Sequence, residues 1–203
     1  MCSILNLTRK VLPSVSKIPQ KNIEAVNSIP EMVLRRMMRD GAQNIVYCDM
    51  NHSAAAVISP EGINTIFTDG LSGCNFANII TKLKDKRFLS ISSHYVPTNR
   101  SGQIAANEKQ LKIYTPHLDT SYKPRVFFNI KNDEKNPNMI VENFKALLNK
   151  FFPQGYKIEV TPYQSSSHPF ASTANITQFD PADISKIKIT NVGEKERFID
   201  LNI

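Results

Sequence analysis

The residues of this chain with the most evident chemistry are a cysteine and a histidine at the two ends of a predicted hairpin. Cys74 opens a predicted strand over 75–83, and His94 lies near the end of the next one, 87–95. If these strands pair around a three-residue loop of 83–85, Cys74 directly faces His94, with Cβ atoms about 4.5–5.5 Å apart. A histidine beside a cysteine favours the thiolate, so this spacing predicts a nucleophile next to its base.

A structural role for the same cysteine stays open. A slip of one residue in the hairpin would put Cys74 and His94 on opposite faces of the sheet. Cysteine is also among the most buried residue types, so Cys74 is alternatively an ordinary core residue at a glycine-flanked turn. Cys48, in the predicted strand NIVYCD (44–49), is the competing nucleophile, and we interpret it as a core residue.

The stretch FTDGLSGC (67–74) carries a resemblance to a known family. LSGC followed by a histidine at the end of the next strand resembles the signature of the bacterial toxin glutamine deamidases, which include the catalytic domain of the cytotoxic necrotizing factors and the Burkholderia lethal factor. The stretch is most similar to the lethal-factor type, in which a threonine lies six residues before the cysteine, as Thr68 does here. The resemblance covers residues 67–95, and its Cys-to-His interval of 20 is longer than we expect for the family.

The resemblance implies hydrolysis of a glutamine side-chain amide in a host protein, by analogy a translation factor or a small GTPase. His94 would take the proton of Cys74, and the thiolate would attack the carboxamide carbon. Backbone N–H groups in the turn at Ser72, Gly73 and Cys74 are the candidates for the oxyanion hole. No metal and no organic cofactor is required.

Two further residues have weaker assignments. Thr68 is the family-matched third member that orients the imidazole, and its alternative is a strand-end threonine with good β propensity. His168, in the stretch SSSHPF, is a candidate substrate contact at the rim of the site, and a solvated loop explains it equally well.

Two other classes of function remain open. The same thiol would serve a transglutaminase or a cysteine protease, and a non-enzymatic interaction module would use Cys74 only structurally. As a toxin, the protein is expected to be secreted or injected by a bacterium and to act in the host cytosol as a monomer.

Composition narrows these classes. The chain has 203 residues, 41% hydrophobic and 21% charged, which is typical of one globular domain, and no apolar run is long enough for a transmembrane helix. No secretory signal is evident in the first residues. The net charge of +7 is spread along the chain rather than clustered, which disfavours a nucleic-acid partner. Three cysteines without paired spacing predict neither a disulfide framework nor a zinc site.

The predicted elements indicate an α+β fold. Residues 1–42 are predicted to form an extension with a helix at 28–40 that packs on a single catalytic domain of 43–203. A helix is predicted at 139–152 and a polar loop at 164–177. The remaining predicted elements are strands, of which the first three form a meander: 44–49, 53–59, 63–68, 75–83, 87–95, 110–115, 125–130, 156–163, and two near the C-terminus. We therefore predict a mixed or mainly antiparallel, sandwich-like sheet structure flanked by a few helices.

Overall fold

The computed structural model of the chain describes residues 44–71, 73–131, 137–163, 174–191 and 196–202. The predicted N-terminal unit of 1–42, with its helix at 28–40, lies outside the described residues. Two of the candidate site residues, Ser72 and His168, lie outside them as well.

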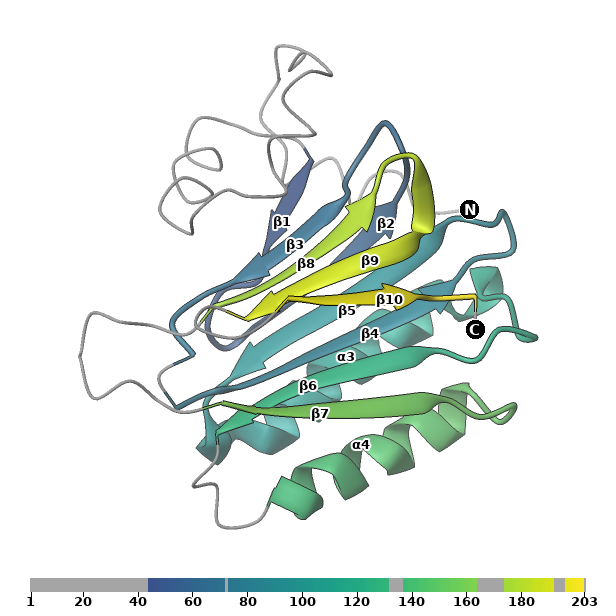
Figure 1. The fold of residues 1–203 in the computed structure, drawn as a ribbon. Helices are drawn as coiled ribbons and strands as arrows, with labels where there is room; N and C mark the ends of the chain where they lie inside the picture. Colours follow the sequence, from purple (N-terminus) through teal and green to yellow (C-terminus); the bar gives the residue numbers. More distant parts are fainter. Residues whose placement is uncertain (1–43, 72, 132–136, 164–173, 192–195, 203) are drawn as a thin grey trace.

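Five strands form one sheet, here called sheet A, in the order β1-β3-β8-β9-β10. β1 runs parallel to β3, and the other neighbours are antiparallel (Figure 1). The strands are β1 (Ile45–Tyr47), β3 (Thr65–Thr68), β8 (Asn175–Asp180), β9 (Asp183–Asn191) and β10 (Arg197–Asp200).

Five further strands form a second sheet, sheet B, in the order β2-β5-β4-β6-β7. Only its β6–β7 pair is parallel. The strands are β2 (His52–Ile58), β4 (Asn75–Lys82), β5 (Phe88–Tyr95), β6 (Arg125–Lys131) and β7 (Lys157–Tyr163).

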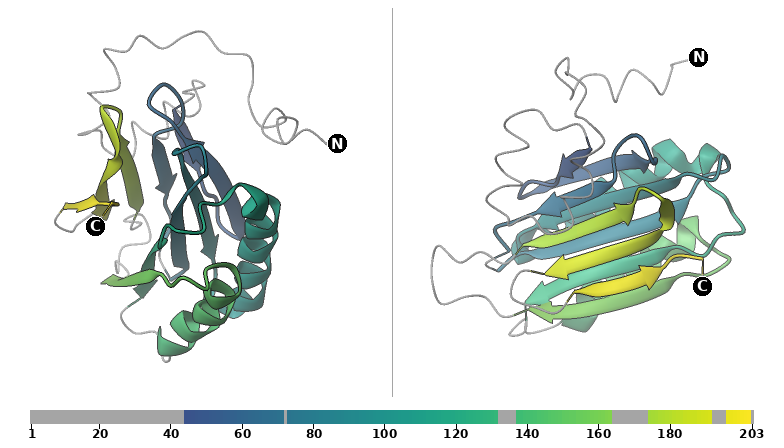
Figure 2. Two further views of the ribbon diagram at one scale, coloured as in Figure 1. Left: turned by 90° about the vertical axis from the view of Figure 1, so that its right-hand side faces the viewer. Right: turned by 45° about the horizontal axis from the view of Figure 1, so that its top comes forward.

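Two helices, α3 (Arg100–Tyr114) and α4 (Pro137–Phe151), cover the outer face of sheet B. Short 3-10 turns at Pro97–Asn99 and Thr115–His117 flank α3. The left view of Figure 2 shows the resulting layers of sheet A, sheet B and helices. None of the helices in the described residues is long and apolar enough to span a membrane.

Two apolar clusters hold the layers together. Both clusters arise from strand alternation, because successive residues of a strand point to opposite faces of the sheet. On β9, for example, Ile187 and Ile189 are buried, whereas Lys186, directly before Ile187, is exposed. The cluster between the sheets contains Ala56, Ile58, Ile66, Ile80, Phe88, Phe127, Phe179, Ile187, Ile189 and Leu201. The cluster between sheet B and the helices includes Ala77, Ile79, Leu89, Ile91, Leu111, Val126, Phe128, Ile140, Phe144 and Leu148.

The space between the sheets becomes polar toward one end. Asn175 Nδ2 donates to Asn129 Oδ1 at 3.1 Å and to Asn191 Oδ1 at 2.8 Å, and Asn129 Nδ2 donates to Asn191 Oδ1 at 2.9 Å. All three amides are buried, and they join β6 of sheet B to β8 and β9 of sheet A. This amide triad joins the two sheets by hydrogen bonds near the C-terminal ends of β3, β5 and β6.

The predicted fold class is confirmed: the fold is α+β, with two mixed, mostly antiparallel sheets and two α-helices in the part of the chain that the structure describes. The predicted meander is wrong, because β1 and β3 pair with each other in sheet A while β2 joins sheet B. The predicted loop at 164–177 is wrong at its end, where β8 begins at Asn175.

The predicted strand at 110–115 is also wrong, since these residues belong mostly to α3. The helix buries Gln103, Asn107, Leu111 and Tyr114, which recur every three or four residues on one face. Two of these four side chains are amides, so the buried face of α3 is not apolar throughout. The pattern of hydrophobic residues in the sequence therefore lacks the period of a helix.

Candidate functional site

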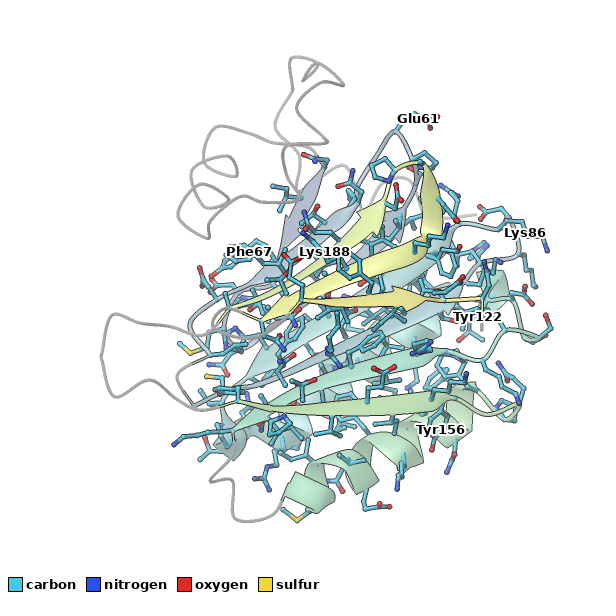
Figure 3. The ribbon with its side chains drawn as sticks, in the orientation of Figure 1. Glu61, Phe67, Lys86, Tyr122, Tyr156 and Lys188 are labelled. Atoms are coloured by element: carbon cyan, nitrogen blue, oxygen red, sulfur yellow. The ribbon has the colours of Figure 1, made fainter. Side chains whose placement is uncertain are left out.

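The candidate site lies at the polar end of the sandwich, which is on the left in Figure 1. β3 ends there at Thr68, β4 begins after Cys74, and β5 ends after His94. In Figure 3, Phe67 marks the end of β3 next to the site, while Lys86, in the β4–β5 turn, lies at the opposite end. Three segments that are separated in sequence therefore meet at one edge of the two sheets.

The register of the β4–β5 hairpin differs from the prediction. Leu83 N donates to Arg87 O and Lys86 N to Leu83 O, so the loop is 84–86, with Lys86 in the left-handed region at φ 73°. Moving the loop by one residue shifts the partners by two, and Phe76 instead of Cys74 faces His94. The predicted direct opposition of Cys74 and His94 is thus wrong.

A shift of two residues keeps the face unchanged, because side chains alternate with period two. Continued by one residue beyond Asn75, where the pairing of β4 with β5 ends, the alternation makes Cys74 a diagonal neighbour of His94 on the face toward sheet A, at a typical separation of roughly 7–8 Å. Cys74 and Phe76 also belong to one buried cluster with Cys48, Leu71 and Tyr163. The predicted nucleophile and base therefore lie at the same end and on the same face, although no hydrogen bond joins Cys74 Sγ to His94.

Thr68 connects His94 to sheet A. Its hydroxyl donates to the backbone oxygen of Cys48 at 2.7 Å and lies 2.9 Å from His94 Nδ1. A hydroxyl has one proton, and a carbonyl oxygen can only accept, so His94 Nδ1–H must donate to Thr68 Oγ1. We assign the tautomer of His94 from this network: Nδ1 carries the proton, and Nε2 has its lone pair available.

Nε2 of His94 is buried but makes no hydrogen bond with any residue that the structure describes. His94 as a whole is 1% exposed, and an unpaired acceptor at such a position costs free energy. Burial lowers the pKa of His94 below its usual value, and the negative charges of Asp69 and Asp49 partly oppose this effect. The neutral imidazole is therefore the form present at neutral pH, with a free basic nitrogen inside the site.

Cys74 is 6% exposed, and burial raises the pKa of its thiol. We expected His94 to lower the pKa of this thiol, but burial alone acts on it and raises it. The backbone oxygen of Cys74 accepts a hydrogen bond of 2.6 Å from the hydroxyl of Tyr163, the last residue of β7. This bond fixes the peptide group that follows Cys74.

The turn before Cys74 has room for a reactant. Gly70 has φ +70°, in the left-handed region that favours glycine. A Cβ placed on Gly73 would meet no heavy atom within 4 Å among the described residues beyond its chain neighbours, so these residues leave the space beside Gly73 open. Asp69, which is buried in the same turn, accepts a 2.7 Å hydrogen bond from the hydroxyl of Tyr47.

Cys48 is part of the site through its backbone. Its side chain is fully buried, and burial raises the pKa of its thiol to about 12, so its interpretation as a core residue agrees with its surroundings. The carbonyl that orients Thr68 is a main-chain group, and no sequence pattern marks it. Tyr163 was also missed, because 89 residues separate it from Cys74.

No group of three or more His, Cys, Asp or Glu side chains that would hold a metal ion occurs among the described residues. The sequence matches no protein-family model and no curated protein. The case for a function therefore depends on the geometry at the end of the sandwich.

Proposed function

We propose that the protein is a cysteine-dependent hydrolase that converts a glutamine of a host protein to glutamate, with Cys74 as nucleophile and His94 as base. The observation that carries the proposal is the arrangement at His94. Thr68 occupies Nδ1 and leaves Nε2 as a buried, unpaired acceptor on the face that Cys74 shares. A thiol nucleophile needs a general base, and an unpaired basic nitrogen on the same face of the sheet can supply it.

In the proposed reaction, His94 Nε2 takes the proton of Cys74 while Sγ bonds to the carboxamide carbon. The oxyanion that forms is held by backbone N–H groups of Gly73 and Cys74, where the open space next to Gly73 admits the substrate. Nε2 then protonates the departing nitrogen, the C–N bond breaks, and ammonia leaves. A water molecule, deprotonated by Nε2, cleaves the thioester to release glutamate, and the proton returns to Sγ.

The neutral state of both groups is consistent with this sequence of steps. Burial raises the pKa of Cys74 and lowers that of His94, so the pair starts as thiol and imidazole. Proton transfer must then accompany attack on the carbonyl instead of preceding it. The side chains are buried, so substrate binding has to displace part of what covers them.

The test uses purified protein and a lysate of host cells. Wild type is expected to produce Gln-to-Glu conversions, seen by mass spectrometry of digested lysate, that Cys74→Ser does not produce. Iodoacetamide should also modify Cys74 faster than Cys48, because Cys48 is fully buried with a pKa near 12. Conversions that persist in a folded Cys74→Ser protein would reject the proposal, and amine incorporation or chain cleavage would indicate a transglutaminase or a protease.

One observation favours a second candidate, an interaction module without catalysis. The 6% exposure of Cys74 and the raised pKa of its thiol are also typical of a structural cysteine. A Cys74→Ser protein that folds normally and keeps its full biological effect would support this candidate. By the motif resemblance, we propose secretion or injection by a bacterium and action in the host cytosol.

A further inference from the structure

The turn Asp49–His52, which joins β1 to β2, places four consecutive exposed residues next to the buried His94. The Cα atoms of Met50 and His94 are partners in an isolated bridge between the two segments. Met50 is 48% exposed, which leaves a large apolar side chain in solvent on the turn whose backbone pairs with His94.

The backbone of this turn is fixed to the strand that carries His94. Asn51 N donates to His94 O at 2.6 Å, and Val96 N donates to Asn51 Oδ1 at 3.3 Å. Asn51 also has φ 60°, a left-handed conformation that is unfavourable for most residues other than glycine, and of which asparagine is the most tolerant.

Hydrogen bonds within the turn add to its rigidity. Met50 N donates to Asp49 Oδ1 at 2.7 Å, His52 N donates to Asp49 O at 3.1 Å, and His52 Nδ1–H donates to Met50 O at 2.9 Å. The turn thus keeps its shape although its side chains are in solvent. A surface that is ordered before binding loses little conformational entropy when a partner docks.

Met50 differs in its position from the other exposed large apolar residues of the described chain. Those residues are Met139 on α4, Val160 on β7 and Phe198 on β10. A single exposed apolar side chain is ordinary in a folded protein. Only Met50 is attached, through its backbone, to the end of the strand that holds the proposed base.

We propose that the turn Asp49–His52 is the substrate-docking rim of the site, and that Met50 contacts an apolar side chain next to the target glutamine. The inference rests on the proposed function and adds a preference among its polypeptide substrates: the target glutamine lies beside apolar neighbours. Met50 then acts on substrate capture, and its removal raises KM more than it lowers kcat.

The test compares two blocked peptides of equal length, in which the glutamine has leucine on both sides or serine on both sides. Ammonia release at limiting peptide measures kcat/KM, and protection of Cys74 from iodoacetamide measures binding without turnover. Wild type should prefer the leucine peptide roughly fivefold, as expected for partial burial of an aliphatic side chain. Met50→Ser should lose this preference in both readouts, while Met139→Ser, which removes a methionine of 43% exposure on α4, should keep it.

Each outcome separates the docking rim from the reaction. Equal handling of the two peptides by wild type, or a preference that survives Met50→Ser, would overturn the docking role, as would failure of both peptides to protect Cys74. Selective protection by the leucine peptide without any release of ammonia would support the rim and overturn the proposed hydrolysis. Ammonia release that continues in Cys74→Ser would overturn the proposed nucleophile independently of the rim.

Discussion

Replacing Thr68 with valine tests the proposed site most directly, because valine has the shape of threonine and removes only the hydroxyl. In the wild type this hydroxyl satisfies two buried groups, the backbone oxygen of Cys48 at 2.7 Å and His94 Nδ1–H at 2.9 Å. Thr68 is fully buried, so water does not replace the lost bonds. The substitution leaves one buried acceptor and one buried donor unpaired.

The expected cost follows from these two orphaned groups. Each unpaired buried group costs about 1–3 kcal/mol, so Thr68→Val should lower the free energy of unfolding by about 2–4 kcal/mol after the gain from the added methyl group. A domain of ordinary stability, about 5–15 kcal/mol, remains folded after this loss. Without Thr68, His94 is free to carry its proton on Nε2, which removes the proposed base. A tautomer preference of about 1.4–2.8 kcal/mol corresponds to a tenfold to hundredfold lower rate at Cys74.

Thr81, on β4 of sheet B, supplies a matched control. Its hydroxyl is also buried, but it has no hydrogen-bond partner. Thr81→Val should therefore be neutral or slightly stabilising, since it replaces an unsatisfied polar group with a methyl group. Thr68→Ser keeps the hydroxyl and should retain most of the rate at Cys74 despite the loss of one methyl group.

Three measurements on these variants decide the matter. Urea unfolding gives the free energies, nitrogen NMR of the histidine rings gives the tautomer of His94, and the rate of Cys74 alkylation gives the reactivity. Two results together would refute this reasoning: Thr68→Val unfolds at the same urea concentration as Thr81→Val, and its His94 still carries the proton on Nδ1. The Thr68 hydroxyl would then not fix the tautomer of His94.

Three further predictions concern the surroundings of the site. Asn175→Ala should lower the free energy of unfolding by about 2–4 kcal/mol in urea, because Asn129 and Asn191 each lose a buried donor; an unchanged midpoint would show that the amide triad does not join the sheets. Burial lowers the pKa of His94 below its usual value of 6.5, so the unfolded state binds more protons and the stability should fall as the pH drops below about 6.5. His94→Gln should flatten this dependence just below that pH, and an equal slope in both proteins would contradict it. Gly70→Ala should cost about 1–2 kcal/mol by thermal unfolding, since the residue has φ +70° and an added Cβ meets nothing within 4 Å, so that backbone strain is the whole effect.

The fold class and the parts of the site with local signals were accessible from the sequence. Alternating strands such as β9 and the amphipathic pattern of α4 are visible in single segments of the chain. Cys74 and His94 were likewise proposed from residue types and spacing, and Thr68 was proposed from the family resemblance. The structure brings these three to one end of the sandwich.

Features that depend on distant or main-chain partners were not accessible. The hairpin register depends on the left-handed conformation of Lys86. Lysine rarely adopts this conformation, so the sequence pattern did not indicate it. The role of Cys48 comes from its carbonyl oxygen, which every residue has. α3 was missed because two of its buried residues, Gln103 and Asn107, are polar and bind Ser93 of sheet B.

Burial acts on the two proposed reacting groups in opposite directions, with a consequence for control of the reaction. It raises the pKa of the Cys74 thiol and lowers that of the His94 imidazole, so both effects oppose the thiolate–imidazolium pair. A neutral pair reacts slowly with a general electrophile, because the thiolate is the nucleophilic form. A substrate carbonyl changes this balance, since the negative charge moves on from sulfur to an oxygen that backbone N–H groups stabilise. By the proposed mechanism, Cys74 then reacts fastest when a substrate occupies the oxyanion position. Docking at the proposed rim, the Asp49–His52 turn, which is hydrogen-bonded to the end of the His94 strand, would then select which glutamine reacts.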